Sequence, residues 1–111
     1  MRDRETEARQ VFEHAAHAYL RALVTPEIVD EHRRQPAGHH SPALAQVLAY
    51  FRQQPTPGKL AVLAAVPGQQ WDVIRLGPLG APHEVVETGF QREDDALHAV
   101  FLRRLAEAGI A

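Results

Sequence analysis

Histidine is the residue type most able to carry chemistry in this sequence, which contains seven histidines and no cysteine. His14 and His17 are three residues apart, so a helix would present both imidazoles on one face, as a pair of metal ligands requires. Both lie opposite the apolar side of the same predicted helix, and no third ligand is implied nearby. We therefore expect a solvent-exposed face there. A histidine-based metal protein is our third hypothesis for function.

A second group of histidines stands beside the only serine of the chain. His39 and His40 precede Ser41, an order that could place a base next to a nucleophile. Ser41 is followed at once by Pro42, however, and a serine before a proline is typical of a helix N-cap. We expect Ser41 to be a structural cap.

Two further histidines border predicted apolar faces. His32 shares a helix face with Ile28, and His98 lies at the edge of an apolar belt in the last predicted helix. We expect both to be hydrogen-bonded histidines at the seams between elements, where they could form pH-sensitive contacts. Phe51 ends an apolar pattern with helical spacing and is predicted to be structural as well.

The remaining motifs that resemble known sites are incomplete. The Pro-Gly-Lys segment at 57–59 lacks the upstream glycine of a phosphate-binding loop, and Leu60 replaces its Ser or Thr. Asp94 and Asp95 would diverge by about 100° on a helix, and acids are common at helix starts. We therefore predict no catalytic residue, no metal ligand and no cofactor in this chain.

Composition and charge exclude several further classes of function. The absence of cysteine excludes thiol catalysis, iron–sulfur clusters and cysteine-type zinc sites. The net charge is −2 and no stretch gathers Lys and Arg into a stripe, so we expect no nucleic-acid partner and no membrane surface. No apolar run approaches the roughly 20 residues that span a bilayer, and the first residues have no apolar signal segment. We expect a cytoplasmic protein.

The elements that must position these residues follow from periodicity and turn signals. Helices are expected at 2–23, 26–35, 42–54 and 93–108, and strands at 59–66, 71–76 and 84–90. Helices covering one face of a small antiparallel sheet make the chain α+β, in the order α-α-α-β-β-β-α, with the last helix packed on the sheet. We treat 1–111 as one domain, with a helical part (1–54) and a part holding the strands and last helix (55–111).

The last predicted helix and the first strand have more apolar surface than one sheet covers. Apolar residues of 96–105 span about half the helix circumference, and the strand at 60–66 is apolar on both faces. Either the helix at 2–23 folds back over this surface, or a partner covers it. The candidate interface residues are Trp71, Phe101, Leu102, Arg103, Arg104 and Leu105.

A series of ordered motifs resembles the small (alpha) subunit of N,N-dimethylformamidase. The series covers about residues 26–105 and includes Pro26-Glu27-Ile28-Val29, Glu31-His32, Ser41-Pro42, Tyr50-Phe51-Arg52, Gly58-Lys59, Trp71-Asp72 and His98-Ala99-Val100-Phe101-Leu102-Arg103-Arg104. The resemblance implies a complex that hydrolyses an amide C–N bond. It also implies that a large (beta) subunit holds a mononuclear iron through two Tyr and a Glu, and that the small subunit provides no iron ligand.

Two main hypotheses follow. In the first, the chain is a non-catalytic accessory subunit that packs on and stabilises a large iron-dependent amidohydrolase subunit. In the alternative, it is a stand-alone homodimer that binds a small ligand or a peptide without catalysis.

Overall fold

The predicted α+β fold is confirmed by a computed structural model, which describes residues 4–56 and 58–111. Pro57, within the segment compared above with a phosphate-binding loop, lies outside the described residues. The elements are, in order, α1 (Arg4–Leu23), α2 (Pro26–Arg34), α3 (Pro42–Arg52), β1 (Leu60–Val66), β2 (Gln70–Arg75), β3 (Glu84–Phe90) and α4 (Glu93–Glu107). Their order is the predicted one, and their bounds lie within two residues of the predicted ranges.

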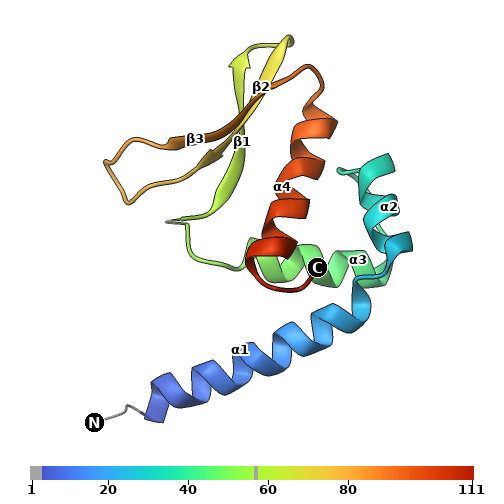
Figure 1. The fold of residues 1–111 in the computed structure, drawn as a ribbon, viewed down its shortest axis with the longest axis vertical. Helices are drawn as coiled ribbons and strands as arrows, with labels where there is room; N and C mark the ends of the chain where they lie inside the picture. The colour runs from blue at the N-terminus through green and yellow to red at the C-terminus, as the bar shows by residue number, and fades with distance from the viewer. Residues whose placement is uncertain (1–3, 57) are drawn as a thin grey trace.

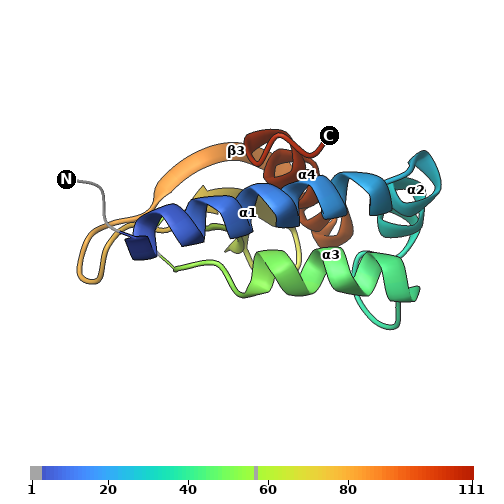
Figure 2. The same ribbon diagram turned by 90° about the horizontal axis from the view of Figure 1, so that it is seen from below.

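Helix α4 is the centre of the molecule. The strands form an antiparallel sheet in the order β1-β2-β3, and α4 packs across one face of that sheet. The opposite side of α4 faces α2 and α3, while α1 runs beside α3 and away from the sheet (Figures 1 and 2). The helix therefore has protein on two sides.

The described residues form two hydrophobic clusters, and α4 contributes to both. Phe101 and Leu105 belong to the cluster shared with the other helices, whereas Val100 belongs to the cluster shared with the sheet. The buried members of the helical cluster are Leu20, Leu44, Val47, Phe51, Phe101, Leu105 and Ile110. This arrangement accounts for the wide apolar belt of α4, because two layers of the same chain cover it.

The helix ends follow the capping rules read from the sequence. Ser41 Oγ accepts a hydrogen bond from the Leu44 backbone N–H at 3.3 Å, and Thr25 Oγ1 accepts one from Ile28 at the start of α2, also at 3.3 Å. After α4, Gly109 adopts a φ of +70°. The N–H of Ile110 then donates to the Leu105 carbonyl at 2.9 Å. This Schellman turn brings Ile110 back into the helical cluster.

A bulge in β3 is held by a buried carboxylate. The pairing of β2 with β3 shifts register between Trp71 and Val73. Asp72 Oδ1 accepts hydrogen bonds from Thr88 Oγ1 at 2.7 Å and from the Gly89 N–H at 3.4 Å. Gly89 has a φ of +89°, a conformation that favours glycine at a bulge. These bonds to the charged form lower the pKa of Asp72.

The expectation that α1 might fold back over the apolar sheet surface is wrong. Helix α1 packs mainly along α3, and its buried residue among those described, Leu20, joins the helical cluster with Phe101 and Leu105. Helix α1 has 20 residues and α3 has 11, so α1 extends about 14 Å beyond the length of α3. The first half of α1 consequently projects into solvent (Figure 1).

Candidate functional site

The predicted seam histidines His32 and His98 contact each other. Their Nδ1 atoms are 2.9 Å apart, which joins α2 to α4 by a hydrogen bond in which one ring donates and the other accepts. His32 also stacks on Phe101, with ring centroids 4.1 Å apart, and on its far side it faces His40 at 6.3 Å. His32 is only 4% exposed, so this interaction belongs to the interior of the chain.

Burial sets the protonation state of this pair. Desolvation, followed by the positive charges of His98, His40 and Arg104, lowers the pKa of His32 from 6.5 to about 4. Desolvation also lowers the pKa of His98, with Arg33 contributing. Both rings are therefore neutral at pH 7, and the ring that accepts the hydrogen bond must be neutral in any case.

A second contact between elements joins α2 to the start of α3. The two carboxylate oxygens of Glu31 accept hydrogen bonds from the backbone N–H and from the hydroxyl of Ser41, both at 2.7 Å. These bonds lower the pKa of Glu31. Ser41 thus caps α3, as predicted, and its hydroxyl also donates a hydrogen bond to the Glu31 carboxylate. The base-and-nucleophile alternative fails because His40 Nε2 is directed to the Gln35 carbonyl oxygen, at 2.8 Å.

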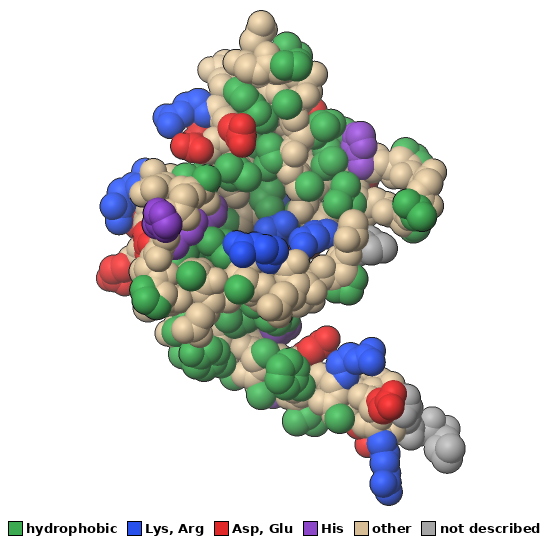
Figure 3. All heavy atoms as spheres, turned by 180° about the vertical axis from the view of Figure 1, so that it is seen from behind, with side chains coloured by type: hydrophobic (Ala, Val, Ile, Leu, Met, Phe, Trp, Pro, Cys, Tyr) green, Lys and Arg blue, Asp and Glu red, His purple; other side chains and the backbone are tan. Residues whose placement is uncertain are grey.

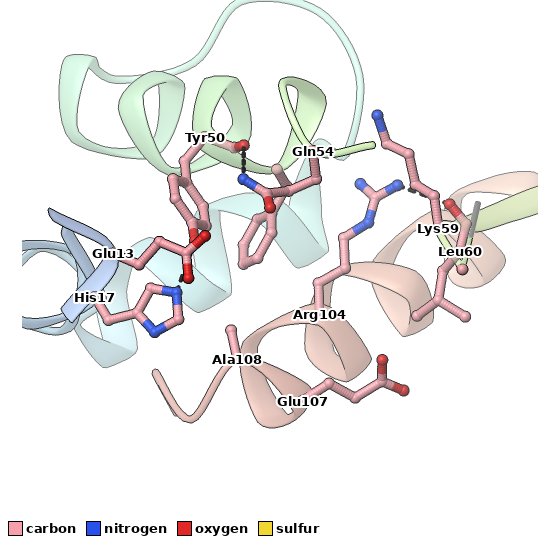
Figure 4. Close-up of a pocket in the computed structure, with 11 residues that line it drawn as sticks. Glu13, His17, Tyr50, Gln54, Lys59, Leu60, Arg104, Glu107 and Ala108 are labelled. Atoms are coloured by element: carbon pink, nitrogen blue, oxygen red, sulfur yellow. Dashed lines mark hydrogen bonds between the residues drawn. The ribbon is translucent and has the colours of Figure 1, made fainter. Parts of the chain in front are cut away.

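One pocket of about 280 Å³ lies between α1, α3 and the end of α4 (Figure 4). Here His17 Nε2 and the Tyr50 hydroxyl are 2.6 Å apart, with Glu13 beside them. Burial and the charge of Glu13 raise the pKa of Tyr50. The expectation of a fully exposed His14–His17 face is thus wrong for His17, because α1 turns this side toward α3. His14 is exposed, as predicted.

A basic hollow of about 320 Å³ lies on the other side of Arg104. It is bordered by the loop after α2, by α3, by β1 and by α4, and its cationic residues are Arg52, Lys59 and Arg104. Figure 3 shows Lys and Arg side chains gathered beside an apolar depression on this face. No sequence pattern indicates this hollow, since Arg52 comes from α3, Lys59 from the segment before β1 and Arg104 from α4.

The candidate interface residues divide between the core and the surface. Phe101 and Leu105 are 2% and 1% exposed, so they are core residues and offer no surface to a partner. Trp71 is half-buried and pairs across the sheet with Ala64 and Phe90. Leu102, 44% exposed, is available for contact.

Arg103 and Arg104 join α4 to the sheet. Arg104 Nη2 donates to the Leu60 carbonyl at 2.8 Å, and Arg103 Nη2 lies 3.6 Å from Glu87 Oε2 on β3. The Arg103 Nε is buried without a hydrogen-bond partner in the structure. Both arginines therefore have structural contacts within the chain in addition to any contact with a partner.

Most of the large exposed apolar side chains lie on α1 and on the sheet; Leu79, in the loop before β3, and Leu102 of α4 are the others among the described residues. On α1 they are Val11, Phe12 and Tyr19, which we call the α1 apolar surface; Phe12 is 73% exposed. On the sheet they are Leu63 and Val66 of β1 and Val85 of β3. The chain thus has exposed apolar surface beyond its core, as expected for β1, but most of it lies on α1 and the sheet and not on α4.

The described residues assemble no group of three or more His, Asp or Glu that could hold a metal ion. Nor does any helix within residues 4–56 and 58–111 combine the length and apolarity needed to cross a membrane. Taken together, fold and site define a small α+β protein built around one central helix, with one helix that projects beyond the rest.

The chain belongs to the N,N-dimethylformamidase alpha subunit family, whose model matches residues 7–111. It is 42% identical over 88 residues to the N,N-dimethylformamidase alpha subunit of Alcaligenes sp, and 38% identical over 85 residues to that of Paracoccus aminophilus. Each alignment covers 74% of this chain but only 64% and 60% of the respective relative. The chain therefore matches less than two thirds of the length of these proteins.

Proposed function

We propose that this chain is a non-catalytic accessory subunit that packs on, and stabilises, a large subunit of an amide-hydrolysing enzyme. Membership of the alpha subunit family supports assembly with another subunit. The observation that carries the proposal is the α1 apolar surface. Val11, Phe12 and Tyr19 are each more than half exposed, on a helix in which residues 4–15 are all exposed.

A helix in this position gains little from its own chain. Isolated helices of about 12–15 residues are marginal in water, and most helical stability in proteins comes from burying an apolar face. Residues 4–15 are all exposed. Docking of this half on a partner would bury its apolar side chains and would stabilise the helix at the same time.

The chemistry of the complex would then belong to the partner. We propose that the iron is held by the large subunit, as the resemblance to the small subunit of N,N-dimethylformamidase implies. The residues of this chain that do interact closely, His32 with His98 and Glu31 with Ser41, connect elements of the fold. We assign no catalytic step to them.

Co-purification tests the proposal. The tagged chain is expressed with the large subunit of its native host, and recovery of the large subunit is compared between wild type, Phe12→Asp and Gln10→Asp. Gln10 lies on the opposite side of α1 and is exposed, so it is the matched control for adding an acid to this helix.

We expect Phe12→Asp to lower recovery of the large subunit at least about tenfold, as for a residue at the centre of an interface. Gln10→Asp should leave it unchanged. Equal recovery with both variants would contradict docking through α1. A folded homodimer in light scattering, with no second protein recovered, would favour the alternative of a stand-alone binding module.

A further inference from the structure

The basic hollow contains positive charge that the chain does not neutralise. Among the described residues, no Asp or Glu lines it, and no carboxylate lies within 4 Å of Arg52, Lys59 or Arg104 as an ion pair. Lys59 and Arg104 also border the neighbouring pocket, which Glu13 and Glu107 line; Glu107 pairs there with Arg75 at 2.7 Å. This is unusual in a chain whose net charge is −2.

Two of the three cations are held in place by the backbone. The Arg104 guanidinium donates to the Leu60 carbonyl at 2.8 Å, and the Lys59 ammonium donates to the Arg52 carbonyl at 2.9 Å. Each of these bonds uses one N–H and leaves others free. The side chains are thus oriented before any ligand arrives, which reduces the ordering that binding would require.

Because the Arg104 guanidinium is partly removed from water, an anion bound beside it would stabilise its charge. This side chain is half-buried, and desolvation lowers its pKa. A charge removed from water is stabilised when an opposite charge with matching hydrogen bonds is supplied. A carboxylate fits the guanidinium fork, because its two oxygens can accept two parallel N–H bonds.

Most of the remaining lining of the hollow is apolar. Leu48, Val62, Leu97 and Val100 line it. The imidazoles of His32 and His40 also border it, and His32 is neutral at pH 7. We propose that the basic hollow is a binding site for a small monocarboxylate whose short aliphatic chain lies against these apolar side chains. The carboxylate accepts hydrogen bonds from Arg104 and Lys59, with Arg52 contributing charge at the rim. This inference does not depend on the proposed accessory role, since no residue of α1 lines the basic hollow.

A heteronuclear NMR titration of the ¹⁵N-labelled full chain with butyrate tests the site. Butyramide, which has nearly the same shape but no charge, is the matched ligand control. We expect saturable shifts for amides of 59–62 and 97–104 with butyrate, and binding at least about tenfold weaker with butyramide, since bonds to a charged group are the stronger ones.

Two variants locate the site. Lys59→Met and Arg104→Met keep an aliphatic side chain but remove the charge, and each should weaken butyrate binding about tenfold or more. Lys59→Met is the informative variant if Arg104→Met fails to fold. Arg92→Met is the matched control, because Arg92 is exposed at the start of α4 and does not line the hollow.

The proposal is overturned if butyrate causes no saturable shifts, if butyramide binds equally well, or if Lys59→Met and Arg92→Met behave alike. Shifts confined to other surfaces would overturn it as well. If no large subunit is recovered in co-purification but butyrate still causes these shifts, the accessory role is contradicted and the carboxylate site is supported.

Discussion

At the scale of single residues, His32 makes stability depend on pH. Its pKa falls from 6.5 to about 4 in the folded chain, through burial first and neighbouring positive charges second. The unfolded chain therefore binds more protons than the folded chain between these values. The contribution of His32 to stability is complete above about pH 6.5 and is lost as the pH falls toward 4.

We predict that the free energy of unfolding falls by up to about 3 kcal/mol from this group between pH 7 and pH 4. Denaturant unfolding across this range measures it. His32→Phe, which keeps an aromatic ring on Phe101, should flatten the pH dependence, whereas the exposed His39→Phe should not. Parallel pH profiles for wild type and His32→Phe would contradict the assignment.

Ser41 provides a second test at this scale, because its hydroxyl has two partners. Ser41→Ala removes the cap of α3 and the bond to Glu31, and it should destabilise the chain by about 1 kcal/mol. Asp is normally as good a cap as Ser, but Ser41→Asp would face the Glu31 carboxylate and should be no better than Ser41→Ala.

Thr25 is the matched control for this effect. It caps α2 through the Ile28 N–H, and no carboxylate contact to its side chain is found in the described residues. Thr25→Asp should therefore be nearly neutral. Thermal unfolding of the three variants and the wild type measures the comparison, and a stable Ser41→Asp would show that Glu31 contributes nothing at the cap.

At the scale of elements, adjacent residues of α4 have opposite roles. Phe101 is buried against α2 and α3, and Leu102 is exposed. We predict that Phe101→Ala lowers the free energy of unfolding by about 3–5 kcal/mol, while Leu102→Ala changes it by less than about 0.5 kcal/mol. Chemical denaturation measures both. Similar losses for the two would mean that α4 is rotated relative to this structure.

This pair also shows what the sequence could and could not predict. Periodicity predicted both ends of α4 within one residue and placed Phe101 and Leu102 in its apolar belt. It could not show whether a partner or the same chain covers the belt, because that depends on the placement of α2 and α3. The same limit applies to α1, where the apolar stripe was visible in sequence but the shorter length of α3 decides which part is buried.

The site was predictable where a local rule applied. Ser41 and Thr25 precede prolines, so their caps follow from adjacent residues. His32 and His98 were expected at seams, but their direct contact joins residues 66 positions apart and has no local signal. The basic hollow also has no local signal, since Arg104 joins Arg52 and Lys59 only when α4 packs against α3 and the segment before β1.

At the scale of the whole molecule, stability should be unevenly distributed. Helix α4 connects both hydrophobic clusters, and it is tied to the sheet by Arg104 and to α2 by His98. Residues 4–15 of α1 are exposed along their whole length. Local opening is easiest where few apolar contacts oppose it, so this half of α1 should open without the rest of the fold.

Amide hydrogen exchange measures this difference directly. In the free chain we predict fast exchange at residues 4–15 and slow exchange in α4 and β2, with at least a hundredfold between them, about 2.7 kcal/mol of opening free energy. Binding of a partner through the α1 apolar surface should slow exchange at residues 4–15 and leave α4 nearly unchanged. Slow exchange throughout α1 in the free chain would show that this helix is already stable alone. The exposed Phe12 would then no longer be an argument for a partner.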